Sequence, residues 1–186
     1  MPKILKLHIE LIYTEVWREI LIESDRTFHE LHEVLQIIFE WKNYHLREFT
    51  ISRDKSIGPD KREEIIPGRT GLDEKDTELS EFLQLEGDSI DYMYDFGDGW
   101  KHTIEVKEIL AKDEIDKYDT FPAVIDGEKK APPEDCGGPP GYERVLEAFN
   151  NPNNIEHEEL LDWLEDDFDP EEFDKESMNE ALAKTC

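Results

Sequence analysis

The chain has 186 residues and carries 48 acidic against 21 basic side chains, which gives a formal net charge of -27 at pH 7. This charge disfavours direct binding to a nucleic-acid backbone, and no apolar run approaches the roughly 18 residues that a membrane helix needs. A hydrophobic fraction of 37% is enough for a packed core, which argues against a wholly disordered chain. The composition therefore predicts a globular protein with neither nucleic acid nor membrane as a direct partner.

The two cysteines, Cys136 and Cys186, stand fifty residues apart and form neither a disulfide framework nor a CxxC metal motif. The chain runs from Met1 directly into alternating sequence, without the apolar stretch of a signal peptide. Both features are typical of a reducing compartment. We therefore expect the protein in the cytoplasm.

Residues 4–11 alternate apolar and polar side chains, which predicts a half-buried strand, and residues 15–23 predict a second strand joined to it as a hairpin. Thr27 and Glu30 have the spacing of a capping box. The apolar residues that follow recur every three or four positions. They predict an amphipathic helix over 27–40.

Residues 44–53 predict a third strand. The Gly, Pro and charged residues of 54–76 predict a long exposed loop, with a short strand at Ile65 and Ile66. A short helix is expected over 77–83.

Two further strands, 89–96 and 100–109, flank a Gly-Asp-Gly apex. Residues 111–140 then predict a loop-rich connector, because Pro and Gly interrupt them repeatedly. The remaining predicted helices cover 141–149, 156–166 and a weak acidic segment after Pro170.

This order of elements predicts an α+β fold: a mixed β-sheet around one main helix, resembling a β-grasp, with a C-terminal helical extension. Residues 1–110 would form the sheet domain. Residues 111–186 would form a loop-rich connector and an acidic helical extension packed on it. We expect both parts to form a single folding unit, because 186 residues suit one domain.

The late hairpin is the first candidate site. A three-residue Gly-Asp-Gly loop would pair Tyr94 with His102 and Asp95 with Lys101. Asp95 then has a structural explanation as half of an ion pair, and Asp98 has one as a turn residue. His102 is either a core histidine bonded to Tyr94 or a ligand. The apolar, aromatic face of the hairpin would hold Tyr92, Tyr94, Phe96, Trp100, His102, Ile104 and Val106.

The second candidate site is the segment 131–142, APPEDCGGPPGY, whose two Pro-Pro pairs impose a stiff backbone path. Glu134, Asp135 and Cys136 have the chemistry of metal ligands or acid-base groups. In the structural alternative, the two carboxylates cap a helix that begins near Tyr142, and Cys136 fills a small buried space. The combined candidates for catalysis or for a divalent metal are Asp98, His102, Glu134, Asp135 and Cys136.

Residues 156–180 contain thirteen acidic side chains and a single basic one, Lys175. These acids form either a solvated face or a surface for a basic partner. His157 and Glu158 begin an HExxH-like pattern, but Leu161 stands in place of the second histidine, so no metalloprotease site is predicted. A helix face that packs on the body is expected from Leu160, Leu161, Trp163, Leu164 and Phe168.

The chain resembles the plasmid pRiA4b ORF-3-like family, which is often labelled resolvase-like. The matching stretches are LHEVLQIIFEWKNYHLREF (31–49), YMYDFGDGWKHTIEV (92–106), APPEDCGGPPGYERVL (131–146) and HEELLDWLEDDFDPEEFD (157–174). The resemblance implies an α+β fold and carries no established activity with it.

Two departures from the family pattern bear on the site. Members often carry cysteine where this chain has Val124 and Ala131, so only Cys136 remains for a thiolate-based site. The resolvase label finds no support, because a serine recombinase needs a nucleophilic serine among arginines and a basic DNA-binding module.

Three hypotheses of function follow. The acidic surface and the lack of a catalytic signature favour a non-enzymatic binding module with a protein partner and no cofactor. The alternative is a small metal-assisted hydrolase or nuclease-like enzyme that uses the five candidate residues. A weaker third hypothesis is that the acidic C-terminal segment mimics DNA or binds a basic partner.

Overall fold

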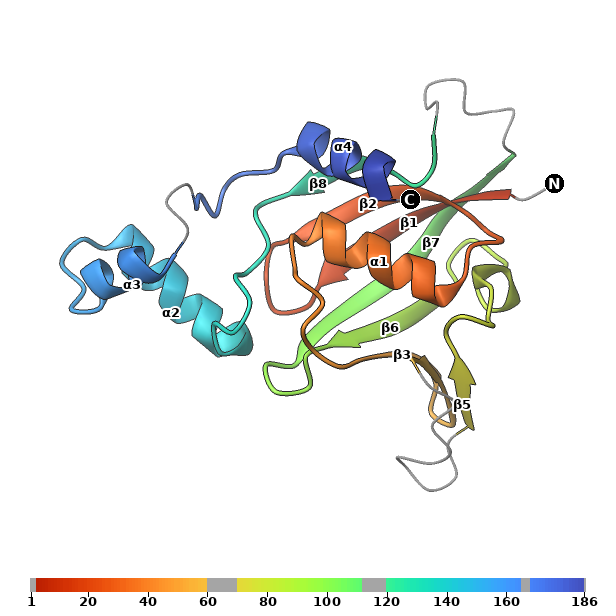
Figure 1. The fold of residues 1–186 in the computed structure, drawn as a ribbon, viewed down its shortest axis with the longest axis horizontal. Helices are drawn as coiled ribbons and strands as arrows, with labels where there is room; N and C mark the ends of the chain where they lie inside the picture. The colour runs from red at the N-terminus through yellow and green to blue at the C-terminus, as the bar shows by residue number, and fades with distance from the viewer. Residues whose placement is uncertain (1–2, 60–69, 112–119, 165–167, 186) are drawn as a thin grey trace.

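A computed structural model describes residues 3–59, 70–111, 120–164 and 168–185. Its fold is mixed α+β, with one eight-stranded sheet and four α-helices (Figure 1). The predicted strand at Ile65 and Ile66, and the cysteine at 186, lie outside the described residues. None of the described helices is long and apolar enough to cross a membrane.

The sheet has the strand order β5-β4-β3-β6-β7-β1-β2-β8. Only β4 and β5 pair in parallel, and all other neighbours are antiparallel, so the predicted mixed sheet is confirmed. The strands are β1 (Lys3–Leu11), β2 (Trp17–Glu23), β3 (Arg47–Ser52), β4 (Lys55–Gly58), β5 (Thr70–Asp73), β6 (Ser89–Tyr94), β7 (Trp100–Ala111) and β8 (Ala123–Glu128).

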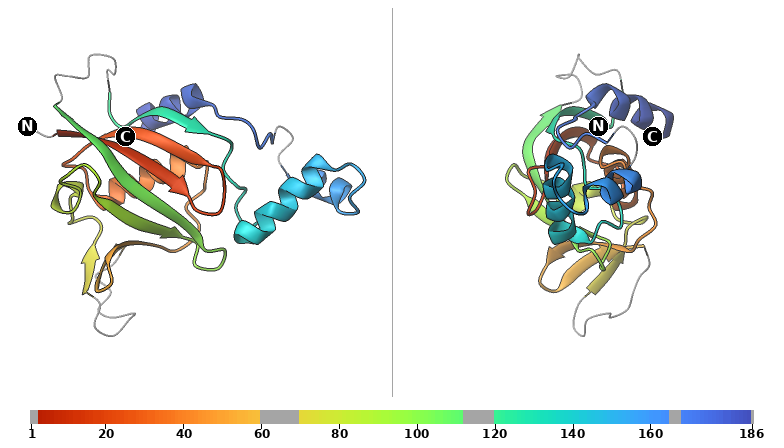
Figure 2. Two further views of the ribbon diagram at one scale, coloured as in Figure 1. Left: turned by 180° about the vertical axis from the view of Figure 1, so that it is seen from behind. Right: turned by 90° about the vertical axis from the view of Figure 1, so that its left-hand side faces the viewer.

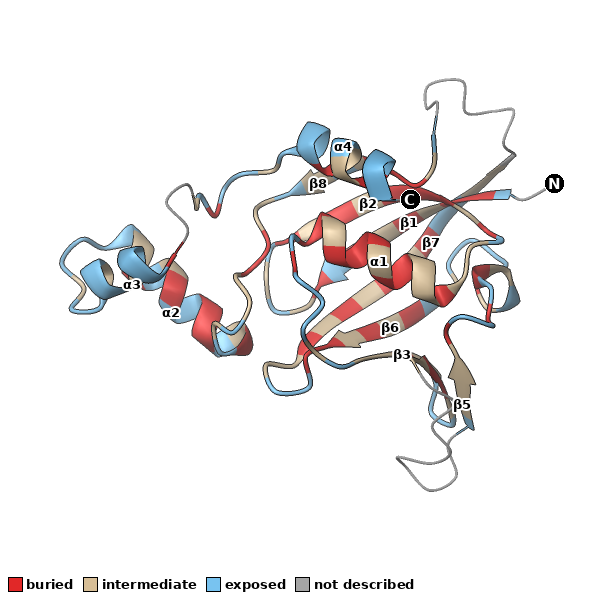
Figure 3. Ribbon diagram, viewed as in Figure 1, coloured by how far each residue is buried: buried red, intermediate tan, exposed pale blue. Residues whose placement is uncertain are grey.

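The helix α1 (Phe28–Ile38) lies across one face of the sheet, as the sequence predicts (Figure 1). Its N-terminus carries the predicted capping box, in which the Thr27 side chain accepts from the Glu30 amide and the Glu30 carboxylate accepts from the Thr27 amide. The buried stripe of α1 faces the strands (Figure 3). The core between helix and sheet includes Leu5, Leu7, Ile9, Ile20, Ile22, Phe28, Leu31, Leu35, Phe49, Tyr92, Ile104 and Val106.

The opposite face of the sheet is more open, as the view from behind shows (Figure 2). Along β1 the residues on this face are Lys6, His8 and Glu10, and they are half-buried or exposed. Ile4 and Leu21 form a small second cluster there. One-sided burial explains the alternation of β1 from Leu5 to Leu11, because successive strand residues point to opposite faces of the sheet.

The prediction of a long loop over 54–76 is wrong near both ends of this segment, where the structure has strands. Residues Lys55–Gly58 form β4 and Thr70–Asp73 form β5, which together extend the sheet edge. These strands have four residues each and include Gly58 and Gly71, so their pattern is too short to read as alternation. A 3-10 turn at Leu79–Glu81 follows, in place of the predicted short helix.

The predicted connector over 111–140 contains a strand that its sequence does not reveal. β8 pairs antiparallel with β2 and closes the other edge of the sheet. The helix α4 (Lys175–Thr185) lies over this edge, where the Asn179 side-chain amide accepts from the Val124 backbone amide at 2.8 Å and donates to the Val124 carbonyl at 2.9 Å. A helix after Pro170 is therefore present as expected, but it is not acidic, because it carries two glutamates and two lysines.

The helices α2 (Gly138–Asn150) and α3 (His157–Trp163) extend away from the sheet as a pair (Figures 1 and 2). α2 begins three residues before its predicted start, because prolines 139 and 140 fit the first helical turn. The predicted packing face on α3 is only partly right. Leu164 is buried, whereas Leu161 and Trp163 are 43% and 50% exposed.

Arg18 of β2 is fully buried and joins three elements. Its guanidinium donates to the carbonyls of Trp17, Ile38, Glu128 and Lys129, at the end of α1 and the end of β8. Burial lowers the pKa of Arg18 to about 10, so the side chain stays charged at neutral pH. This buried cation fixes the end of β8 against the C-terminus of α1, where carbonyl oxygens favour positive charge.

Candidate functional site

The hairpin between β6 and β7 differs from the predicted register by two residues. Tyr92 lies opposite His102 and Tyr94 lies opposite Trp100, so the loop has five residues. An even shift keeps every side chain on its predicted face but changes its partners. Lys101 therefore pairs with Asp91 at 2.9 Å, and the predicted Asp95–Lys101 ion pair is wrong.

Asp95 begins this loop and turns inward. Its φ of 54° is left-handed, and its residue surface is 8% exposed. The Oδ1 atom accepts from the Gly97 amide at 2.9 Å and from the Asp98 amide at 3.3 Å, which holds the loop closed. Phe96, which the shifted register takes out of the strand, is half exposed instead of lying on the apolar face.

The hairpin loop and the proline-rich segment meet directly. Asp98 Oδ2 accepts a hydrogen bond from the Gly137 amide at 3.0 Å. A Cβ at Gly138 would collide with the Asp98 carbonyl oxygen, so the two backbones touch at this point. We call the contact of residues 95–99 with residues 134–138 the junction. Asp98 thus serves as more than a turn residue, because it holds the second segment.

Glu134 also anchors the proline-rich segment. Its Oε1 accepts from the Tyr94 hydroxyl at 2.6 Å, and its Oε2 accepts from the Lys42 amide at 3.1 Å. Burial, with the hydrogen bond to Glu134, raises the pKa of Tyr94. The predicted capping of α2 by a carboxylate is wrong, because the N-cap of α2 is Gly137 and has no side chain to accept.

His102 lies beneath the junction and is fully buried. Its ring contacts Phe39 and Trp41 edge-to-face, and its Nδ1 lies 3.4 Å from the Tyr92 carbonyl. Its predicted partner Tyr94 is therefore replaced by Tyr92. Burial lowers the pKa of His102 to about 3, so the imidazole is neutral at ordinary pH.

Cys136 lies within the junction and is half-buried. Burial, reinforced by the charge of Asp98, raises the pKa of the Cys136 thiol to about 12. The sulfur therefore stays protonated at neutral pH, which disfavours a role as a nucleophile, since the thiolate is the reactive form.

The structure brings together three ligand-type residues, of which only Asp135 is among the candidates predicted from the sequence. One nitrogen of His45 and one carboxylate oxygen each of Asp95 and Asp135 lie within 4.8 Å of one another. Asp135 is the outermost of them, with its side chain 71% exposed and a left-handed φ of 58°. Within the described ranges this is the one group of three such residues. We call it the His45 cluster.

A cleft of about 780 Å³ lies next to the junction. The β1–β2 turn, the tip of the β6–β7 hairpin and the first turns of α2 form its walls. Tyr13 stands at its edge, 84% exposed and with a left-handed φ of 69°. The cleft is lined by Tyr13, Thr14, Glu15, Val16, Gly99, Lys129, Pro139, Pro140, Tyr142, Glu143, Leu146, Pro170 and Glu171.

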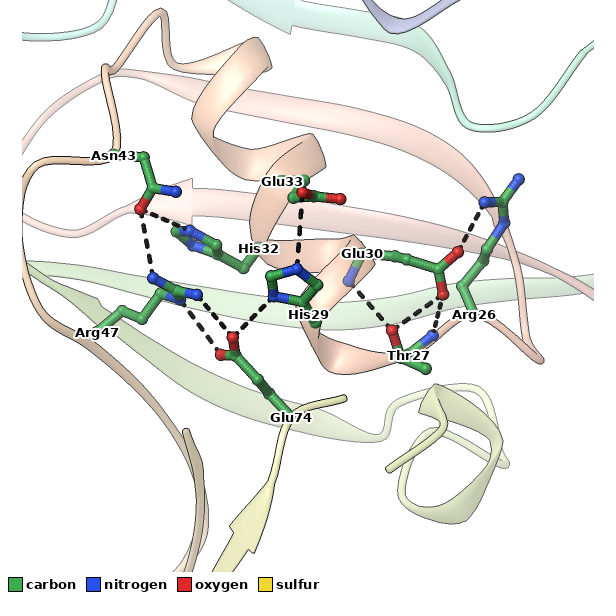
Figure 4. Close-up of polar contacts among 9 residues, drawn as sticks. All are labelled: Arg26, Thr27, His29, Glu30, His32, Glu33, Asn43, Arg47 and Glu74. Carbon is green, nitrogen blue, oxygen red and sulfur yellow. Dashed lines mark hydrogen bonds and ion pairs between the residues drawn. The ribbon is translucent and has the colours of Figure 1, made fainter. Parts of the chain in front are cut away.

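A second polar cluster lies at the N-terminal half of α1 (Figure 4). Glu74 is fully buried and binds Arg47 at 2.6 Å and His29 at 2.8 Å. His32 is held between the Asn43 side chain and the Tyr92 hydroxyl. We call these residues the Glu74 network.

Comparison with known proteins places this geometry in a family. The family model described as plasmid pRiA4b ORF-3-like protein matches residues 3–177. The uncharacterized protein y4hQ of Sinorhizobium fredii (strain NBRC 101917 / NGR234) is 33% identical over 98% of this chain and 92% of its own length. The crystal structure of MM3350, a protein of unknown function from Methanosarcina mazei Go1, is 32% identical. It has a TM-score of 0.84 and covers 95% of this chain and 97% of that one.

Proposed function

The chain belongs to the plasmid pRiA4b ORF-3-like family, and we propose that it is a non-enzymatic binding module that holds an extended, basic segment of a partner protein in the cleft. The observation that carries the proposal is the cleft itself, with aromatic and proline side chains on its walls and acidic groups at its rim.

The walls suit an extended peptide. Tyr13 and Tyr142 stand with three prolines and Leu146 around the cleft, and grooves lined by aromatic rings bind proline-rich, extended segments in other proteins. An exposed tyrosine held in a left-handed conformation is costly, because such backbone angles are disfavoured outside glycine. Contact with a bound peptide explains both the exposure of the Tyr13 side chain and its left-handed backbone conformation.

The charge of the cleft favours a basic ligand. Its lining holds three carboxylates, from Glu15, Glu143 and Glu171, against the single ammonium of Lys129. Lys129 already binds Glu15 and Glu171, so it is not free to bind an acidic ligand. An acidic rim on an acidic protein attracts cationic segments from a distance.

The junction supports binding rather than catalysis. Asp98 and Glu134 accept hydrogen bonds that hold segments together, and His102 is fully buried. A general acid or base has to reach the proton that it moves, and these groups are engaged within the protein. Their geometry instead keeps the wall of the cleft rigid.

The test is a binding titration with two synthetic peptides of equal length, both alternating proline and leucine with a charged residue. In one peptide the charged residue is arginine and in the other it is glutamate. Calorimetry at low salt should show binding of the arginine peptide alone, weakening as salt rises, because rim charges are screened.

The matched variants are Tyr13→Ala in the cleft and Tyr44→Ala outside it, since both tyrosines are exposed. Tyr13→Ala should weaken binding about tenfold or more, as expected for an aromatic anchor, and Tyr44→Ala should not. Equal binding of both peptides, or no effect of Tyr13→Ala, would refute the proposal.

A small metal-assisted hydrolase is the second candidate, favoured by the His45 cluster at the exposed side of the junction. Hydrolysis of bis(p-nitrophenyl) phosphate in the presence of Zn²⁺ or Mn²⁺ tests it. Turnover that disappears in Asp135→Asn supports an enzyme, and turnover that persists in this variant or is absent in the parent protein counts against one.

A further inference from the structure

We propose that the His45 cluster is a binding site for one zinc-class divalent transition-metal ion, with His45 Nε2 and Asp135 Oδ1 as ligands and Asp95 as the carboxylate that orients the imidazole. The site does not depend on a peptide in the cleft. It is built by residues from the segment between α1 and β3, from the hairpin loop and from the proline-rich segment.

The two nitrogens of His45 face different carboxylates. Nδ1 lies 3.5 Å from Asp95 Oδ2, and Nε2 lies 3.3 Å from Asp135 Oδ1. A histidine that binds a metal commonly has a carboxylate at its other nitrogen, which fixes the tautomer and aims the lone pair at the ion. Asp95 stands in that position.

His45 Nε2 has no hydrogen-bond partner among the described residues, although this atom has almost no surface exposed to solvent. Its neighbour Asp135 Oδ1 does not complete a hydrogen bond, despite the distance of 3.3 Å. With the ring proton on Nδ1, which faces Asp95, Nε2 carries a lone pair, and a lone pair and a carboxylate oxygen this close repel each other unless a positive charge lies between them. A metal ion supplies that charge.

The separation of the two atoms matches an edge of a tetrahedral zinc site. Zinc binds histidine nitrogen and carboxylate oxygen at about 2.0–2.2 Å, so two such ligands at a tetrahedral angle stand about 3.4 Å apart. The observed 3.3 Å between His45 Nε2 and Asp135 Oδ1 lies close to this value. One ion can therefore join both atoms without moving the segments.

Asp95 gives an independent reason for a cation here. Its residue is more than nine-tenths buried, and its Oδ1 is used by the loop amides. Among the described residues its Oδ2 faces His45. Lys101, the predicted counter-ion of Asp95, is bound to Asp91 instead. A buried carboxylate without a cation is costly, and a metal ion bound to His45 offsets that cost.

The ligand set selects the class of ion. An imidazole among the ligands favours zinc and its neighbours, whereas calcium and magnesium prefer oxygen ligands alone. The exposure of Asp135 leaves an entry path and room for water at the remaining positions. Binding there would tie Asp135 to the segment before β3 and so hold the junction closed.

The experiment uses the full chain after treatment with a chelator, and Co²⁺ and Zn²⁺ as probes. We expect one ion per chain by calorimetry, and visible Co²⁺ absorption of the kind given by a low-coordinate site, displaced by Zn²⁺. His45→Gln and Asp135→Asn should abolish the Co²⁺ absorption. Asp95→Asn should weaken binding about tenfold to a hundredfold, as expected for an orienting carboxylate.

The matched control is His8→Gln, because His8 also lies 3.6 Å from a carboxylate, that of Glu19, on the open face of the sheet. This control should bind Co²⁺ like the parent chain. Asp135→Asn also reports on the site if His45→Gln fails to fold, because the Asp135 side chain is largely exposed. Absence of binding, or binding that survives Asp135→Asn, overturns the proposal. So does equal binding of millimolar Ca²⁺ or Mg²⁺.

Discussion

The Glu74 network and the junction with the adjoining His45 are both polar clusters, but they differ in how completely their hydrogen-bonding atoms are paired. In the network, Glu74 accepts from Arg47 and contacts His29, and His32 contacts Asn43 (Figure 4). The other ring nitrogen of His32 contacts the Tyr92 hydroxyl. The buried side-chain polar atoms that lack a partner in the described part of the chain are His45 Nε2, Trp100 Nε1 and His102 Nε2. None of them belongs to the network.

This contrast separates a structural cluster from a candidate site. A fully paired polar network stabilises one arrangement of the surrounding elements and has nothing left with which to bind a ligand. The His45 cluster, which adjoins the junction, keeps a nitrogen without a hydrogen-bond partner, His45 Nε2, next to the exposed carboxylate of Asp135, and such an atom is a feature of a site that binds a ligand. The two clusters should therefore respond differently to substitution.

The largest effect is expected in the network, from Glu74→Gln. The change leaves the Arg47 guanidinium largely buried without its carboxylate, which typically costs about 3–5 kcal/mol of unfolding free energy. Urea denaturation measures it. Glu105→Gln, which breaks the exposed pair with Lys107, is the control and should change stability by no more than about 1 kcal/mol. Similar values for both variants would mean that the network is not structural.

The next effect is expected at the junction, from Gly138→Ala. The new Cβ would meet the Asp98 carbonyl, and the residue has a left-handed φ of 69°, so both strain and collision oppose folding. We expect a loss of at least about 2 kcal/mol in the free energy of unfolding, measured by urea denaturation.

Gly87→Ala is the matched control for Gly138→Ala, because Gly87 has a φ of 89° but no atom within 4 Å of the position that an alanine methyl group would occupy. It should lose only about 1 kcal/mol, the cost of the backbone angle alone. Equal losses in the two variants would show that the close contact of the junction contributes nothing.

The smallest effect concerns pH and links both regions. Burial lowers the pKa of His32 in the network and of His102 beneath the junction from 6.5 to about 3. Above pH 6.5 each histidine is neutral in both the folded and the unfolded chain. Below pH 6.5 each histidine is protonated in the unfolded chain but stays neutral in the folded chain down to about pH 3. The free energy of unfolding therefore falls as the pH drops.

Each of these histidines should lower the free energy of unfolding by up to about 1.4 kcal/mol per pH unit within that window. Urea titrations at pH 7.5, 6.5 and 5.5 measure how steeply the free energy of unfolding changes with pH. His32→Gln should reduce this slope by the contribution of one histidine. A slope that is unchanged in His32→Gln would contradict the assignment.

The sequence predicts the fold best where one periodicity extends over a long element. The helix α1 and the strand β1 have uninterrupted patterns, because each buries one face against the same core. Strands β4, β5 and β8 are not predicted, since short strands at or next to the sheet edge owe their conformation to the neighbours with which they pair.

The candidate site is only partly readable for a related reason. Alternation predicts the face of a strand residue but not its cross-strand partner. The register predicted for the hairpin is wrong by two residues, so the sequence assigns Asp95 to an ion pair with Lys101 and not to the candidate site. His45 stands in the segment after α1, where no periodicity marks it, and only the folded backbone brings it to Asp135. Its place inside the family-like stretch 31–49 is the one signal that could have drawn attention to it.

The contact of Asn179 with β8 has a consequence for how the sheet ends. An unpaired edge strand offers its amide and carbonyl groups to any chain that can add a further strand. At Val124 the side-chain amide of Asn179 supplies one acceptor and one donor, the same pair that a ninth strand would bring. A helix residue thus supplies the hydrogen bonds of a strand, so no ninth strand can pair with β8 at Val124 while α4 stays in place, although that position carries neither a charge nor a proline.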